Sequence, residues 1–202
     1  LVREDGREGD VFSLIGPKKY DVPWKDLERQ GWIATACCHE VRIPLPDEGR
    51  MEYATAEQRN KYAVAAHNPV KLDVLKALVS RHNGANILVI GTYLDQLERV
   101  AEELGSPLIT GKTPVAKRRE LFEQFRQQEV RLLVLSKVGN FSIDLPDANV
   151  AIEISGTFGS RQEEAQRLGR IVRPKRDGSQ AHFYTLVTRD TVDQTFAANR
   201  QR

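Results

Sequence analysis

From residue 68 onward, segments typical of buried strands alternate with segments typical of amphipathic helices. Continuous apolar runs at residues 86–91, 130–136 and 149–155 predict strands that are buried on both faces. Residues 93–105 carry one apolar stripe at helical spacing. Strands and helices that alternate in this way build a mostly parallel sheet with helices on both faces. The sequence therefore predicts an α/β fold of three layers.

Cap and turn residues mark the ends of the expected helices. Asn68 as N-cap with Pro69 behind it predicts the start of one helix, and Gly84 its end. Gly105 ends the helix that begins near residue 93. A third helix, over residues 113–125, is expected to be capped by Thr113.

Composition bounds the class of protein. With 202 residues and 40% hydrophobic content, the chain can bury one core with a small appendage. No segment of this sequence resembles a secretory leader or is apolar over the length needed to cross a bilayer, so we expect neither a secreted precursor nor a membrane protein. The first residue is not Met, and the chain resembles a piece of a longer protein.

Charge is unevenly distributed, although the net charge is only +2. Residues 1–10 carry four acidic and two basic side chains, whereas residues 160–176 carry six basic and two acidic ones. The basic stretch is the part of the chain best suited to an anionic ligand.

The two cysteines and four histidines show no metal-binding pattern. Cys37 and Cys38 are neighbours in an expected strand, so their side chains should point to opposite faces and form neither a zinc site nor an ordinary disulfide. Two free cysteines are typical of a protein in a reducing, intracellular compartment. The histidines are scattered along the chain without metal-ligand spacing.

The first 67 residues are less regular. Residues 11–34 indicate a turn and a short amphipathic helix that lead into a strand at 33–45. Residues 47–67 read as a polar helix or pair of helices without a core stripe, which suggests a projecting element.

Ligands of such sheets bind beyond the carboxyl ends of the strands. Four segments of the sequence fall there, namely residues 91–93, 110–112, 136–139 and 155–157. One of them, Gly111-Lys112-Thr113, ends like a phosphate-binding P-loop. A P-loop also needs a glycine five positions before Gly111, where this chain has Ser106, and it follows a strand rather than a helix. We therefore exclude a P-loop.

Residues 160–173 predict a helix with a cationic face. Ser160 and Glu163 form a capping box, and Gln166, Arg170 and Arg173 fall on one side. Guanidinium groups suit phosphate because they are always charged and bind its oxygens in pairs. The alternative is a solvated face on which Glu163 pairs with Arg167.

A second candidate lies between two expected strands. Gly139 allows a ligand to approach the backbone closely, and Asp144 can accept a hydrogen bond from a ribose or orient an arginine. The alternative is that Asp144 is an ordinary turn residue before Leu145-Pro146.

In this order and spacing, residues 136–152 and 155–175 resemble motifs V and VI of superfamily 2 helicases, in particular the XPB branch of DNA-repair and transcription translocases. Residues 2–6, 14–27 and 31–34 resemble that branch as well, so the resemblance covers nearly the whole chain. It implies a RecA-like fold. Residues 31–202 would be the second motor domain, with a short thumb-like segment at about 47–67, and residues 1–30 an extension from the end of the first.

The resemblance also implies roles for individual residues. On the nucleotide side, Gln166, Arg170 and Arg173 would face ATP bound to the first domain, with one arginine as the finger, and Gly139, Asp144 and Arg167 would contribute to nucleotide binding. On the DNA side, Gly111-Lys112-Thr113 would grip a phosphate. The complete set expected on that side is Thr92, Thr110, Gly111, Lys112, Thr113, Arg118 and Ser136, where Arg118 is either a phosphate contact or a structural residue.

The implied activity is that of an ATP-dependent 3′–5′ DNA helicase or translocase. ATP and Mg²⁺ would be held mainly by the first domain, which carries the Walker motifs that this sequence lacks. The implied partners are DNA, the first RecA-like domain and a nuclease or a repair or transcription complex, in the cytoplasm or in a eukaryotic nucleus. The alternative is a RecA-like module that binds nucleic acid or protein without catalysis.

Three departures from the family pattern bear on these roles. Ser142 stands where such helicases often have glycine, and Lys117 where the family usually has an acid. The 47–67 segment is short for a DNA-gripping thumb.

Overall fold

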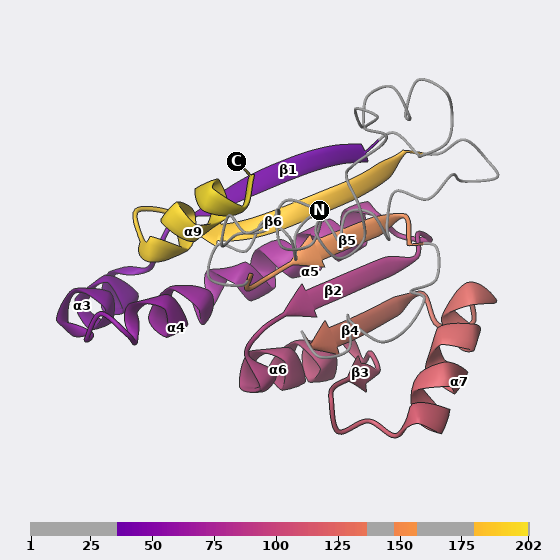
Figure 1. The fold of residues 1–202 in the computed structure, drawn as a ribbon. Helices are drawn as coiled ribbons and strands as arrows, with labels where there is room; N and C mark the ends of the chain where they lie inside the picture. Colours follow the sequence, from indigo (N-terminus) through magenta and orange to yellow (C-terminus); the bar gives the residue numbers. More distant parts are fainter. Residues whose placement is uncertain (1–35, 137–147, 157–179, 202) are drawn as a thin grey trace, which may run out of the picture.

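The computed structural model describes residues 36–136, 148–156 and 180–201 (Figure 1). Its centre is a six-stranded sheet in the order β1-β6-β5-β2-β4-β3, in which every described pair of strands is parallel. The strands are β1 (Ala36–Ile43), β2 (Ile87–Gly91), β3 (Leu108–Ile109), β4 (Leu132–Ser136), β5 (Val150–Glu153) and β6 (Ala181–Thr188). The mostly parallel sheet predicted from the alternation is thus confirmed.

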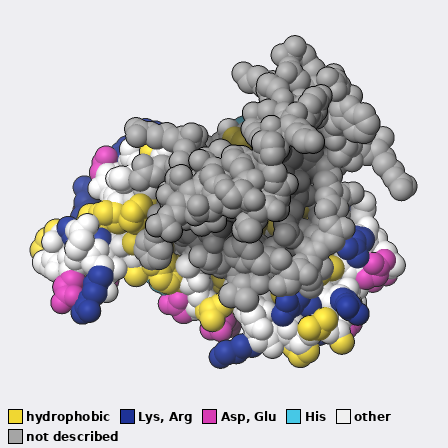
Figure 2. All heavy atoms as spheres, viewed as in Figure 1, with side chains coloured by type: hydrophobic (Ala, Val, Ile, Leu, Met, Phe, Trp, Pro, Cys, Tyr) yellow, Lys and Arg dark blue, Asp and Glu magenta, His cyan; other side chains and the backbone are white. Residues whose placement is uncertain are grey.

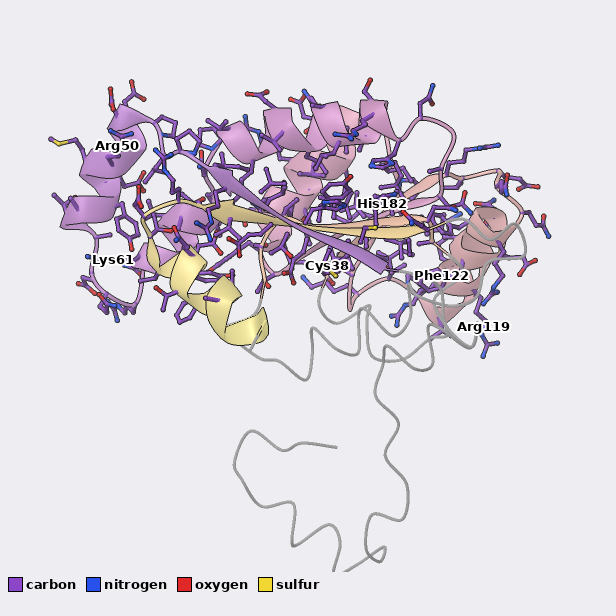
Figure 3. All side chains as sticks on the ribbon, turned by 90° about the horizontal axis from the view of Figure 1, so that it is seen from above. Cys38, Arg50, Lys61, Arg119, Phe122 and His182 are labelled. Atoms are coloured by element: carbon purple, nitrogen blue, oxygen red, sulfur yellow. The ribbon has the colours of Figure 1, made fainter. Side chains whose placement is uncertain are left out.

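Helices lie on both sides of the sheet. They are α3 (Asp47–Thr55), α4 (Lys61–Ala66), α5 (Val70–Arg81), α6 (Leu94–Leu104), α7 (Val115–Arg126) and α9 (Val192–Gln201). Seen from above in Figure 3, α5 lies on one side of the sheet and α9 on the other. No helix in the described part of the chain has the length and apolar character needed to cross a membrane.

The core has two halves because the central strands are buried on both faces. Along β2, Leu88 and Ile90 point toward α7, where they pack with Phe122 and Phe125. The alternate residues of the strand pack with α5 and α6. The exposed fraction of each of these strand side chains is 3% or less, which accounts for the continuous apolar runs in the sequence.

The predicted end of α6 is confirmed, whereas the predicted bounds of α5 are wrong: Pro69 occupies its cap position, and the helix ends at Arg81 with His82 as C-cap rather than at Gly84. The Asn68 side chain accepts a hydrogen bond from the Val70 N–H (3.1 Å), so it still contacts the first residue of the helix. Gly105 closes α6 in the left-handed conformation, at φ +58°.

The 47–67 segment forms two helices, which was one of the two structures expected for it. Only the first of them, α3, projects from the core. Helix α3 has no buried residue. Helix α4 buries Tyr62, Ala65 and Ala66 against α9 and β6. The expectation of a segment without a core stripe is therefore wrong for α4, whose small side chains let it approach β6 closely.

Candidate functional site at the carboxyl edge of the sheet

The carboxyl ends of four neighbouring strands bring the predicted residues of the described chain to one edge. Gly91 at the end of β2 is paired with Ser136 at the end of β4, and Ile109 of β3 with Leu135. On the other side of β2, Ile90 is paired with Glu153 of β5. Thr92, Thr110 and Ser155, each of which follows its strand closely, therefore lie along the same edge of the parallel sheet.

Residues 110–113 form a tight turn that its own side chains close. The Thr110 N–H donates to the Thr113 hydroxyl oxygen (2.9 Å), and the Lys112 N–H donates to the Thr110 hydroxyl oxygen (3.2 Å). The Thr113 N–H donates to the Thr110 carbonyl (3.2 Å). The backbone donors of Thr110, Lys112 and Thr113 are thus engaged within the turn, which fixes its shape.

This bonding corrects one prediction. Thr113 does not cap the following helix, because its hydroxyl accepts from Thr110, and Pro114 occupies the cap position of α7 without a side-chain hydrogen bond. The groups that the turn presents outward are Gly111 and Lys112, which are both exposed. No ion pair among the described residues involves Lys112. The turn therefore offers a lysine ammonium beside the amino end of a 12-residue helix.

Arg118 lies behind this turn. Its guanidinium donates to the Thr113 carbonyl (2.9 Å), and the side chain is 9% exposed. Its Nε has no hydrogen-bond partner among the described residues. Of the two roles expected for Arg118, these contacts favour the structural one, because the buried guanidinium donates to the backbone of the turn.

Basic side chains continue along α7. Lys117 pairs with Glu120 (2.9 Å) and Arg126 with Glu123 (3.1 Å). Arg119 is exposed and lies on the outer side of α7, whereas Phe122 points to the sheet (Figure 3). Figure 2 shows Lys and Arg side chains over α7 interspersed with acidic ones, so this surface has no single sign.

The other two predicted DNA-side residues of the described chain are engaged or buried. The Thr92 hydroxyl donates toward the carbonyls of Gly156 (3.0 Å) and Ser155 (3.3 Å). Ser136 is 3% exposed, and its hydroxyl has no hydrogen-bond partner among the described residues. Thr92 thus ties the end of β2 to the chain that leaves β5.

Four side chains hold the chain where it leaves β5, and we call them the strand-end anchor: Tyr62, Lys71, Thr92 and Gln96. Tyr62 donates to the Gly156 carbonyl (2.5 Å), and Lys71 to the Ile154 carbonyl (2.9 Å). Gln96 accepts from the Ser155 hydroxyl (2.8 Å), which in turn accepts from the Thr92 N–H (2.9 Å). The anchor draws on four separate elements of the fold.

A buried ion pair underlies the anchor. The Lys71 ammonium lies 2.8 Å from the Asp193 carboxylate, and the two side chains are 2% and 1% exposed. The same carboxylate oxygen accepts from the Thr188 N–H at the end of β6 (2.9 Å). The pair therefore joins α5 and α9, which lie on opposite faces of the sheet, at the carboxyl ends of β5 and β6.

A small cavity of about 160 Å³ lies beside the anchor, between the first turns of α5 and α6. Its rim contains His67 and Asp95, which contact each other at 2.9 Å, and Arg99. The hydrogen bond from His67 lowers the pKa of the Asp95 carboxyl below its usual value, with a smaller opposing effect of burial.

Three histidines that the sequence scatters are neighbours in the structure. His39 of β1 and His182 of β6 are 3.3 Å apart between ring nitrogens, and His82 lies 2.8 Å from the Tyr184 hydroxyl. No group of side chains in the described ranges has the geometry to hold a metal ion. This cluster could not be predicted, because it depends on the pairing of β1 with β6, which brings together His39 and His182, 143 residues apart.

The predicted nucleotide-side residues lie outside the described residues. They are Gly139, Asp144, Gln166, Arg167, Arg170 and Arg173. Gly156, which the anchor holds, is the last described residue before the 157–179 segment that contains four of them.

Comparison with known proteins places these features in a family. A family model described as the ERCC3/RAD25/XPB C-terminal helicase matches residues 27–202. The chain is 59% identical over its full length to the DNA 3′-5′ helicase XPB of Mycobacterium tuberculosis, and 60% identical to that of Kineococcus radiotolerans. It is 40% identical over 207 residues to the general transcription and DNA repair factor IIH helicase/translocase subunit XPB/SSL2 of Saccharomyces cerevisiae. The chain spans 37%, 36% and 25% of the lengths of these relatives.

Solved structures support the fold. The DEAD-box protein SrmB of E. coli, solved with RraA, superimposes with a TM-score of 0.58 at 17% identity, over 83% of this chain and 84% of that one. The C-terminal domain of the DEAD-box protein Dbp5 gives a TM-score of 0.57 at 17% identity, over 65% and 76% of the two chains. The predicted RecA-like fold is thereby confirmed.

Proposed function

Because this chain belongs to the ERCC3/RAD25/XPB C-terminal helicase family, we propose that it is the second motor domain of an ATP-dependent 3′–5′ DNA helicase or translocase that acts in DNA repair. The observation that carries this proposal within the structure is the 110–113 turn at the carboxyl edge of a RecA-like sheet. It is rigid, its lysine is exposed, and it precedes the amino end of α7.

We propose that this turn binds a phosphate of the DNA backbone. The Lys112 ammonium supplies the charge, and the amino end of α7 supplies the positive end of a helix dipole. The hydrogen bonds among Thr110, Lys112 and Thr113, with Arg118 behind them, hold the turn in one shape before DNA arrives. Less ordering is then needed on binding, which favours affinity.

The test of the DNA contact is Lys112→Ala in the full-length protein. Each phosphate contact contributes about 0.9 to the slope of log affinity against log salt for duplex DNA. We expect Lys112→Ala to lower affinity for all DNA sequences alike and to reduce that slope by about 1, measured by fluorescence anisotropy over a salt series.

Arg126→Ala is the matched control, because it removes one positive charge from the last turn of the same helix, where Arg126 already pairs with Glu123. It should leave the slope unchanged. An equal effect of both variants, or a loss confined to one DNA sequence, contradicts a phosphate contact at the 110–113 turn.

We propose that the nucleotide site is completed by residues of the 157–179 segment. Gln166, Arg170 and Arg173 face ATP and Mg²⁺ held mainly by the first motor domain, with one arginine as the finger and Arg167, Gly139 and Asp144 on the nucleotide side. The resemblance of motifs V and VI supports these roles. An arginine finger contributes about 10³ to 10⁵ in rate, because it stabilises charge that develops in the transition state.

Partners follow from the same proposal. The partners that this function requires are DNA and the first RecA-like domain, and we propose that the protein meets them inside the cell. A repair or transcription partner is supported by the yeast relative, which is named as a subunit of general transcription and DNA repair factor IIH. Helix α3 of the thumb-like segment has no buried residue, so such a partner could bind it without disturbing the core.

A further inference from the structure

We propose that the strand-end anchor positions the arginines of the 157–179 segment for catalysis, and that Tyr62 connects this positioning to the helical pair α3–α4. The inference rests on the proposed function, because it concerns how the nucleotide-side arginines are placed. Tyr62, Lys71, Thr92 and Gln96 are here positioning residues, which act through the backbone at residues 154–156.

The first support is that three successive carbonyls beyond the end of β5 each accept a hydrogen bond from a side chain. The Ile154 carbonyl accepts from Lys71 and the Gly156 carbonyl from Tyr62, while the one hydroxyl hydrogen of Thr92 is shared between the Gly156 carbonyl (3.0 Å) and the Ser155 carbonyl (3.3 Å). Strand carbonyls are ordinarily bound by the neighbouring strand. Here the ladder has ended, and side chains from α4, α5 and the β2–α6 loop fix the direction in which the chain leaves the sheet.

The second support is close packing at the same point. A Cβ atom at Gly91 would lie 2.9 Å from the Leu97 side chain and 3.0 Å from the Ser155 hydroxyl. A side chain at Gly91 would therefore require the Leu97 and Ser155 side chains to shift, so the end of β2 packs tightly against Ser155. With Gln96 bound to the other side of the Ser155 hydroxyl (2.8 Å), the backbone here has little room to shift.

Such fixing matters for an arginine finger because its contribution depends on placement. A displacement of about 1 Å in a catalytic group can lower a rate about 10²-fold. Gly156 directly precedes the segment that contains Gln166, Arg170 and Arg173. Its position therefore sets where that segment begins relative to the sheet edge.

Tyr62 gives the anchor its connection to the surface. Its ring is 2% exposed and stands edge-on to Phe196 of α9, at 5.2 Å between ring centroids. It belongs to α4, and α3, which packs against α4, has no buried residue of its own. In Figure 1 these two helices extend from the sheet at the carboxyl ends of the strands. The Tyr62 hydroxyl is thus a direct contact between α3–α4 and the Gly156 carbonyl, through which we infer that DNA or a partner on α3–α4 acts on the anchor.

The test compares Tyr62→Phe with Tyr53→Phe in the full-length protein. Each removes one phenolic hydroxyl from the same helical pair. The Tyr62 hydroxyl binds Gly156, whereas the Tyr53 hydroxyl accepts from the Val192 N–H at the start of α9 (2.8 Å). We expect Tyr62→Phe to lower kcat of DNA-stimulated ATP hydrolysis about tenfold, with KM for ATP and Kd for DNA changed less than about twofold. Tyr53→Phe should leave kcat within about twofold of wild type. Equal kcat values for the two variants overturn the inference.

A double-mutant cycle separates positioning from general destabilisation. If Tyr62 acts through the arginines, Tyr62→Phe should have almost no further effect on kcat in the Arg170→Ala/Arg173→Ala background. An undiminished effect in that background overturns the inference. If the arginine variant itself retains wild-type turnover, the proposed function fails; if it loses turnover while Tyr62→Phe does not, only the positioning inference fails.

Thr92→Val provides a second variant should Tyr62→Phe not fold. It removes the hydroxyl bound to the Ser155 and Gly156 carbonyls and keeps the Thr92 N–H that binds Ser155. A fall in kcat at unchanged DNA affinity supports the positioning role. Weaker DNA binding at unchanged kcat overturns it for Thr92.

Discussion

At the scale of single residues, the buried pair of Lys71 and Asp193 has a clear consequence for folding. Two charges that are both nearly inaccessible to water lose their hydration, and each is stable there because the other neutralises it. The remaining hydrogen bonds, to the Ile154 carbonyl and from the Thr188 N–H, satisfy further polar groups. Removing one partner leaves the other charge buried without its counter-ion.

We therefore expect Lys71→Met to lower the free energy of unfolding by about 3–5 kcal/mol, measured by urea denaturation followed by circular dichroism. Lys76→Met is the control on the same helix, because Lys76 pairs with Glu103 at 2.6 Å on the exposed surface. Its effect should be too small to resolve. Similar losses for both variants would contradict the role assigned to burial.

The 110–113 turn shows what sequence can and cannot give at this scale. A turn before a helix was predictable, because Gly111, Thr113 and Pro114 stand together between an apolar strand and an amphipathic helix. The hydrogen bond that the Thr113 hydroxyl accepts was not predictable. The hydroxyl can accept from the helix or from Thr110, and only the path of the backbone decides between them.

At the scale of elements, the pairing of β1 with β6 brings His39 and His182 together, and His82 at the end of α5 completes a histidine cluster. Burial lowers the pKa of His82, and the nearby His182, Arg81 and His39 lower it further. Burial also lowers the pKa of His182, followed by the effects of His39 and Arg81. His82 and His182 thus favour the neutral imidazole, and the Tyr184 hydroxyl lies 2.8 Å from His82.

The sign of the effect on stability follows from proton binding. Below the ordinary histidine pKa of about 6.5, the unfolded chain binds protons that the folded protein does not, so the free energy of unfolding falls as pH falls. We expect wild-type protein to unfold at lower urea concentration at pH 5.5 than at pH 7.5. His182→Gln should reduce this difference.

A pH dependence in His182→Gln that equals that of the wild type would show that the cluster is not its source.

Elements were predictable to the extent that their pattern is local. The continuous apolar runs predicted β2, β4 and β5, and glycine in the left-handed conformation ended α6 where expected. The burial of α4 was missed, because six residues with three alanines are too short to show a stripe. The histidine cluster was missed because the order of strands is a property of distant segments.

At the scale of the whole molecule, the structure shows a RecA-like sheet with a rigid turn at one part of its carboxyl edge and a fixed strand exit at another. The turn and the helical pair α3–α4 lie apart along that edge (Figure 1). We propose that DNA contacts the 110–113 turn and that the strand-end anchor holds the start of the 157–179 segment. Closure on the first motor domain would then couple DNA binding to ATP hydrolysis.

The most direct test of this account is the rate of DNA-stimulated ATP hydrolysis by the full-length protein, with and without Arg170→Ala or Arg173→Ala. At least one of these changes is expected to lower kcat at least about a hundredfold, while affinity for ATP changes little. Wild-type turnover in both variants would contradict it, and the chain would then be a binding module rather than half of a motor.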